Sequence, residues 1–102
     1  MAGSDAESDI VAVADAPERS RYEITVDGAV AGFAQYRLRP DHITVLHTEI
    51  DDGYGGRGLA GRLVRAVLDD ARARGLRVVA VCEFAKAWID RHPGYADVVR
   101  AG

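Results

Sequence analysis

Polar and apolar residues alternate through three successive stretches in the first half of the chain, which is the pattern of half-buried β-strands. Residues 21–26 form the first stretch, and Asp27-Gly28 is a two-residue hairpin turn that leads into a returning strand over residues 30–38. A second turn leads into a third strand over residues 42–50. Strict alternation along the third strand places one set of side chains on one face, namely Ile43, Val45, His47 and Glu49, and places Thr44, Leu46, Thr48 and Ile50 on the other.

The hydrophobic period then changes from two to 3.6 residues, which indicates an amphipathic helix over residues 59–74. Gly75 ends this helix, a short apolar strand follows over residues 76–82, and a second helix is predicted over residues 84–91. A strand, a helix and a strand of this size favour a right-handed parallel crossover. The predicted fold class is therefore α/β (α+β), with a mixed, mostly antiparallel sheet of about four strands and two flanking helices in the order β-β-β-α-β-α.

Composition and charge argue against several classes of function. Residues 1–19 are acidic and lack periodicity, so we expect them to be a disordered tail, with one domain over residues 20–102. The tail accounts for the net charge of −3, because residues 20–102 carry 12 basic and 11 acidic groups. A nearly neutral domain lacks the basic surface that nucleic-acid binding requires. No apolar run approaches the ~20 residues of a membrane span. The single cysteine, Cys82, excludes an internal disulfide and a cysteine-cluster metal site. We therefore expect a cytoplasmic protein with no metal, nucleic acid or membrane as partner.

The main candidate for chemistry is a glycine-rich loop over residues 51–60, between the third strand and the first helix. Its glycines leave the backbone free to turn successive amide N–H groups toward one point, at the positive end of the following helix. Such a loop predicts a site for a phosphate or pyrophosphate group. A tight turn with no ligand is one alternative. A nucleotide is another possible phosphate ligand, but the loop lacks the Gly-Lys-Ser/Thr of a Walker loop and the full Rossmann spacing.

This loop resembles motif A of the GCN5-related N-acetyltransferases, the GNAT superfamily, which reads Gln/Arg-x-x-Gly-x-Gly/Ala and holds the pyrophosphate of acyl-CoA. Gly58-Leu59-Ala60 fits the second half of the motif, whereas Gly55 stands where the motif has Gln or Arg. The chain also resembles the small single-domain YjdJ-like and NATD1-like subgroup, in His47-Thr48-Glu49-Ile50, Tyr54-x-Gly56-Arg57-Gly58-Leu59-Ala60, Cys82 and His92-Pro93-Gly94-Tyr95. The resemblance covers residues 21–100 and implies an acetyl-CoA (CoA) site formed by Ile50, Gly55, Gly56, Arg57, Gly58, Leu59 and Ala60.

Three further residues are candidates for catalysis. Acetyl transfer from a thioester requires a neutral amine, so a base must take a proton, and Glu49 at the end of its strand is the best-placed carboxylate. An ion-paired, purely structural glutamate is the alternative. His47 is either a base or proton relay or a packing side chain. Cys82 is expected beside the thioester, where it would carry the acyl group, act as an acid or fill space.

The resemblance implies an N-acetyltransferase that transfers an acetyl group directly from acetyl-CoA to a small-molecule or protein amine. Members of the superfamily usually have two helices between the first two strands and two more strands after the last helix, and this chain is expected to lack both. Because those parts help to shape the acceptor site, the alternative is a non-catalytic module that binds or senses acyl-CoA. The sequence indicates neither the acceptor nor the oligomeric state.

Overall fold

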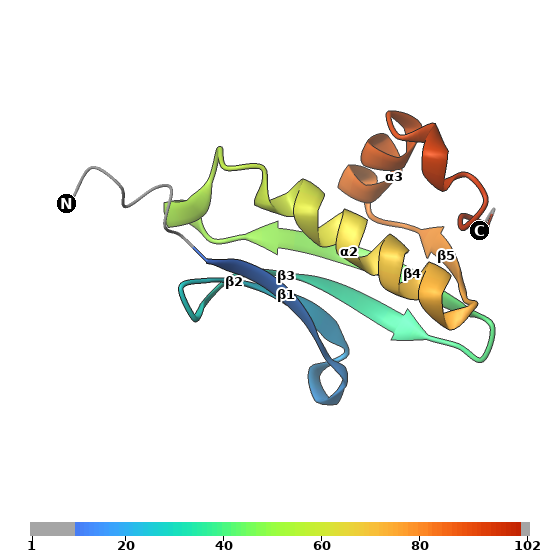
Figure 1. Cartoon of the computed structure of the whole chain (residues 1–102), viewed down its shortest axis with the longest axis horizontal. Coiled ribbons are helices and arrows are strands. Elements are labelled where there is room, and N and C mark those ends of the chain that lie inside the picture. The colour runs from blue at the N-terminus through green and yellow to red at the C-terminus, as the bar shows by residue number, and fades with distance from the viewer. Residues whose placement is uncertain (1–9, 101–102) are drawn as a thin grey trace.

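The computed structural model describes residues 10–100, which form one mixed sheet with both α-helices on one of its faces (Figure 1). The strand order is β1-β2-β3-β4-β5. Strands β1 to β4 pair with one another in antiparallel fashion, whereas β5 is parallel to β4, to which it is connected by the crossover helix α2. In chain order the elements are β1 (Val11–Ala16), a 3-10 turn (Pro17–Arg19), β2 (Arg21–Val26), β3 (Ala29–Leu38), β4 (His42–Ile50), a 3-10 turn (Asp52–Tyr54), α2 (Leu59–Arg74), β5 (Arg77–Ala80), α3 (Glu83–Asp90) and a 3-10 turn (Pro93–Tyr95).

Most of the predicted elements are confirmed. The bounds of β2, β4 and α2 agree with the prediction, β3 begins one residue earlier, and α3 begins at Glu83. Asp27 and Gly28 both have positive φ, 52° and 88°, as a two-residue hairpin turn that follows the twist of its strands requires. The last strand is shorter than predicted, because its backbone pairing ends at Ala80. The mixed α+β fold class is also confirmed.

The prediction of a disordered tail over residues 1–19 is wrong for its second half. Residues 11–16 form a fifth strand, β1, which pairs with β2 along its whole length. Val11 and Val13 pack against the core, and the turn at Asp27 holds the start of the strand, since the Ile10 amide donates to Asp27 Oδ1 at 2.9 Å. Small residues hid this strand in the sequence. Residues 1–9 of the predicted tail lie outside the described part of the chain.

The core lies between the sheet and α2. Six side chains on one face of α2 are buried, as the helical spacing predicted: Leu59, Leu63, Val64, Val67, Leu68 and Ala71. They pack on the inward side chains of the strands, including Ile24, Ala34 and Ile43. Helix α3 packs beside α2 and adds Trp88 to the same core. No helix among residues 10–100 is long and apolar enough to cross a membrane.

A bulge in β4 corrects the predicted faces of that strand. Tyr36 pairs with Val45 but Gln35 pairs with His47, so Leu46 is an extra residue in the ladder. Beyond it, every side chain moves to the opposite face from the one strict alternation predicts. His47 and Glu49 therefore point away from α2, although Ile43 and Val45 point toward it.

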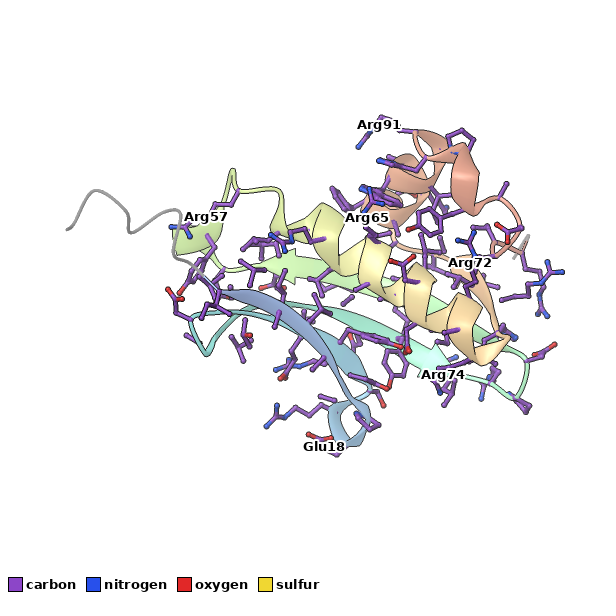
Figure 2. All side chains as sticks on the ribbon, viewed as in Figure 1. Glu18, Arg57, Arg65, Arg72, Arg74 and Arg91 are labelled. Carbon is purple, nitrogen blue, oxygen red and sulfur yellow. The ribbon has the colours of Figure 1, made fainter. Side chains whose placement is uncertain are left out.

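A polar network ties β1 to the C-terminal half of α2. The Tyr36 hydroxyl donates to Asp15 Oδ1 at 2.6 Å, and the Tyr22 hydroxyl donates to Asp70. Arg74, labelled at the C-terminal end of α2 in Figure 2, lies 3.3 Å from Asp70 Oδ2. Burial, followed by the carboxylate hydrogen bond, raises the pKa of each tyrosine above its ordinary value. Both phenols therefore stay protonated to a higher pH than an ordinary tyrosine does.

Candidate functional site

The strands β4 and β5 separate halfway along β4. Their pairing ends at Val45 and Ala80, and the amides of Val81 and Cys82 both donate to the Val45 carbonyl, at 2.9 and 3.1 Å. The chain then leaves the sheet to begin α3, while β4 continues to Ile50. In the described part of the chain, residues 46–50 thus have no strand partner on the side of β5. This leaves an open edge at the centre of the fold.

Backbone direction identifies the amides that face this open edge. The Asp51 amide donates to the Ala31 carbonyl of β3 at 2.8 Å, so the backbone groups of Asp51 point toward β3. Consecutive residues of a strand point their backbone groups to alternate sides. Ile50 and Thr48 alternate with Asp51 along the strand, so their amides point to the other side of β4 and face the open edge. Ile50 was predicted to contribute such an amide, and Thr48 was not.

The glycine-rich loop turns sharply into α2 directly beyond that edge. Gly56 and Gly58 have positive φ, 80° and 74°, which L-residues with a side chain rarely adopt. Gly55 differs from them, with an extended backbone at φ −63° and an amide that donates to the Asp52 carbonyl at 3.4 Å. The conformation therefore requires glycine at positions 56 and 58 but not at position 55.

The N-terminus of α2 has the properties of an anion site. Its N-cap is Gly58, which has no side chain to cap the helix, and its first turn has no acidic residue. The first backbone bond into the helix is from the Arg62 amide to the Gly58 carbonyl at 3.3 Å, so the amides of residues 59–61 precede the intrahelical ladder. Arg57 precedes the helix by two residues. Figure 2 shows its side chain directed away from α2, and its guanidinium lies 5.4 Å from the ring centre of Tyr54. The positive helix end and its amides together fit a phosphate group.

His47 and Glu49 lie together on the outward face of β4. His47 Nε2 is 3.1 Å from Glu49 Oε1, and the two side chains are 56% and 58% exposed. The ring of Phe33, on β3, is 6.0 Å from the His47 ring. A carboxylate beside an imidazole is able to accept a proton from an amine and pass it on. The two residues therefore share one face, as predicted, and their catalytic role stays a prediction.

Cys82 lies on the opposite side of β4 from that pair. It is 9% exposed, and its thiol donates to Thr48 Oγ1 at 3.6 Å. The structure therefore brings together two separate pairs, His47 with Glu49 and Cys82 with Thr48. The second pair lies where β4 and β5 part.

Sequence reasoning missed three residues of this region, namely Thr48, Phe33 and Gly61. Strict alternation placed Thr48 away from the site, and nothing in the sequence marks Leu46 as a bulge. Gly61 was not singled out, yet a Cβ there would lie 2.9 Å from Nε1 of Trp88. The lack of a Cβ at Gly61 lets Trp88 of α3 approach the first turn of α2.

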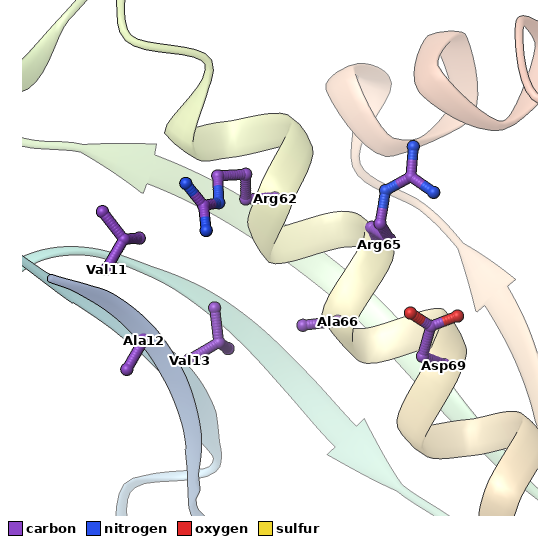
Figure 3. A pocket seen from close by; sticks show the side chains of 7 residues that line it. All are labelled: Val11, Ala12, Val13, Arg62, Arg65, Ala66 and Asp69. Atoms are coloured by element: carbon purple, nitrogen blue, oxygen red, sulfur yellow. The ribbon is translucent and has the colours of Figure 1, made fainter. Parts of the chain in front are cut away.

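A hollow of about 300 Å³ lies elsewhere, between β1 and α2. Figure 3 shows Val11 and Val13 on one side of it and Arg62, Arg65 and Asp69 of α2 on the other. None of the predicted site residues lines this hollow.

Comparisons of the sequence and of the structure with known proteins agree on one family. The family model described as GCN5-related N-acetyltransferase matches residues 21–98. Protein NATD1 of Bos taurus is 33% identical over 51 residues, which are 50% of this chain, and the chain spans only 45% of that relative. The solution structure of a GCN5-like putative N-acetyltransferase from Staphylococcus aureus superimposes with a TM-score of 0.68 and 26% identity, covering 89% of each chain. A ribosomal-protein-alanine N-acetyltransferase from Brucella melitensis biovar Abortus 2308 has the same fold, with a TM-score of 0.58 and 21% identity over 80% of this chain and 62% of that one.

Proposed function

The chain belongs to the GCN5-related N-acetyltransferase family, and on that premise we propose that it transfers an acetyl group from acetyl-CoA to an amine. One observation carries the proposal. The uncapped, positively polarised start of α2 lies directly beyond the open edge of β4. A ligand with a pyrophosphate at one end and an extended, amide-bearing arm at the other matches both features. Acetyl-CoA has this construction.

Different residues would bind the two ends of acetyl-CoA. The amides of residues 56–61 and Arg57 would hold the pyrophosphate, with Gly56 and Gly58 supplying the turn. The amides of Thr48 and Ile50 would hydrogen-bond to the pantetheine arm, as a further strand would at the open edge. Acetyl-CoA supplies an activated thioester. The match to motif A is incomplete at Gly55, so the backbone amides would supply most of the binding to the pyrophosphate.

Proton transfer would be the work of Glu49. The amine arrives protonated, gives one proton to Glu49 and attacks the carbonyl carbon of the thioester. The carbon–sulfur bond breaks, the nitrogen loses a second proton, and the departing thiolate takes one up. His47, 3.1 Å from Glu49, would relay the proton to solvent. We propose direct transfer as the route, because Cys82 is nearly buried and its thiol already donates to Thr48.

Amide chemical shifts test the binding step. Acetyl-CoA titrated into isotope-labelled protein should perturb the amides of residues 56–61 together with those of Thr48 and Ile50. The amide of Arg37, at the far end of β3, is the internal reference. If the amide chemical shifts of residues 56–61 do not change during the titration, the proposed binding site is wrong.

A Glu49→Gln variant tests the catalytic step. Loss of the base should reduce turnover by about 100-fold or more, while acetyl-CoA affinity stays within twofold. The second candidate function, an acyl-CoA-binding or sensing module without catalysis, is favoured by the exposure of the Glu49 and His47 side chains to solvent. Wild-type protein that binds acetyl-CoA tightly but acetylates neither small amines nor peptides would establish that alternative.

A further inference from the structure

The face of the sheet opposite the helices carries an organised set of side chains. Figure 1 shows α2 and α3 on one face, and no helix among residues 10–100 covers the other. On the uncovered face three residues lie in one row across neighbouring strands, because Glu23 of β2 pairs with Phe33 of β3 and Phe33 pairs with Glu49 of β4. Neighbouring strands are about 4.8 Å apart, so the row is about 10 Å long. The candidate base is thus one end of a larger surface.

Contacts link this row into one cluster around Phe33. The Arg21 guanidinium lies 4.6 Å from the Phe33 ring centre, and the His47 ring lies 6.0 Å from it on the side of Glu49. A cation of the chain itself therefore already rests on this ring, which is the geometry of a cation–π contact. The ring is half-buried, and its remaining surface faces solvent.

The two carboxylates of the row differ in their partners. Glu23 accepts from Arg19 at 2.7 Å and from Arg21 at 2.9 Å, and its side chain is 13% exposed. The hydrogen bonds from Arg21 and then Arg19 hold the pKa of Glu23 below its ordinary value. Glu49 contacts the imidazole of His47 and is 58% exposed. An incoming ammonium would therefore bind at Glu49, with its carbon chain over Phe33.

We propose that the acceptor amine is carried by a polypeptide, as a lysine side chain, and that the segment around it lies across the row Glu23–Phe33–Glu49. Enclosed sites bury most of a small ligand, whereas no described helix rises over this face to enclose one. A peptide supplies the missing cover itself, because about three extended residues span the 10 Å row. Its side chains would shield Phe33 and exclude water from the amine at Glu49.

This inference rests on the proposed acetyl transfer and adds the class of acceptor. The acceptors to compare are a pool of nine-residue peptides, each with one central lysine and blocked ends, and the small amines spermidine and N-acetyl-lysine methylamide. Product is measured by mass spectrometry and CoA release by a thiol assay, with all acceptors at equal amine concentration. We expect the best peptides to exceed both small amines at least tenfold in kcat/KM.

Two variants of Phe33 test the surface itself. Phe33→Ala and Phe33→Leu should raise KM for the peptides at least fivefold, with acetyl-CoA affinity within twofold of wild type. Leu38→Ala is the matched control, because Leu38 is an exposed apolar residue at the far end of the same strand. Phe33→Leu keeps the bulk of the side chain, so it tests the ring even where the alanine variant folds poorly.

The outcomes distinguish a failure of the polypeptide acceptor from a failure of the proposed acetyltransferase activity. If acetyl-CoA binds and spermidine or N-acetyl-lysine methylamide is acetylated as efficiently as the peptides, the polypeptide acceptor is wrong and the acetyltransferase stands. Unchanged peptide kinetics in both Phe33 variants would overturn the docking surface. If no acceptor is acetylated, the inference and the proposed catalysis fail together.

Discussion

The conformation of Gly58 makes the sharpest prediction about the loop. Its φ of +74° lies in the left-handed region, and a Cβ built on it meets nothing within 4 Å. A Gly58→Ala substitution therefore changes the backbone preference without introducing a clash. The left-handed conformation costs an alanine about 1 to 2 kcal/mol, and 1.4 kcal/mol is about a tenfold change in an equilibrium constant.

This cost must reduce either the free energy of unfolding or the affinity for acetyl-CoA. If the variant keeps the loop conformation, the free energy of unfolding falls. If the unbound loop relaxes, acetyl-CoA must restore it and the Kd rises. Because Gly58 is exposed and caps α2 without a side-chain bond, we expect relaxation, and hence a Kd raised about 5-fold to 30-fold. Calorimetric titration gives the Kd, and urea denaturation gives the free energy of unfolding.

Two other glycine substitutions control for this reasoning. Gly53→Ala lies in the same loop, at a residue without positive φ and with an open surrounding, so both quantities should stay unchanged. Gly28→Ala introduces strain at φ +88° in the β2–β3 hairpin, so it should lower stability and leave the Kd within twofold. The reasoning is refuted if Gly58→Ala changes neither quantity, or if Gly53→Ala weakens binding to the same extent.

Three further predictions follow from neighbouring features. Gly55→Arg restores the basic position of motif A on an extended backbone, where a Cβ would meet only the Asp52 carbonyl, at 3.8 Å. Acetyl-CoA should therefore bind about fivefold more tightly at low salt. Salt at 1 M NaCl should abolish that gain in affinity, as measured by calorimetry. Tyr22 and Tyr36 have raised pKa values, so their contribution to stability is fully present below the ordinary tyrosine value of 10.0 and is lost as pH rises above it. Denaturation at pH 8 and pH 11 should therefore show a smaller loss for the double Tyr→Phe variant than for wild type, and an equal loss would contradict the network. Cys82→Ala should retain turnover under direct transfer, whereas abolished turnover and a mass increase of one acetyl group on wild-type protein would indicate an acyl-enzyme.

The fold could be predicted from sequence where one physical signal dominates. The apolar stripe of α2 has a single arrangement that buries it, and Asp27-Gly28 has few alternatives to a tight hairpin. The glycine loop was found for the same reason, since positive φ at Gly56 and Gly58 restricts the residue type. Each of these signals is local, so it survives without knowledge of the rest of the chain.

The missed strand β1 has no such local signal. Its residues are alanine, valine and aspartate, and they become a strand through contacts with residues distant in sequence. The Tyr36 hydroxyl binds Asp15 across 21 positions, and the Asp27 carboxylate binds the Ile10 amide across 17. A carboxylate that looks solvating in the sequence is thus the acceptor of a phenol. The acidic character that suggested disorder is part of what anchors the strand.

The bulge at Leu46 accounts for the error about the site, and it shows which part of the reasoning was robust. Strict alternation correctly grouped His47 with Glu49, because both follow the bulge and their relative parity is unaffected. It wrongly grouped them with Ile43 and Val45, because one inserted residue inverts every face beyond it. The consequence is chemical: without the bulge these two side chains would point into the core beneath α2, where an ionised carboxylate would be strongly disfavoured. With it, Glu49 faces solvent while the amide of Thr48 faces the open edge. A single extra residue thus separates the face on which we propose that the acceptor binds from the edge on which acetyl-CoA would bind.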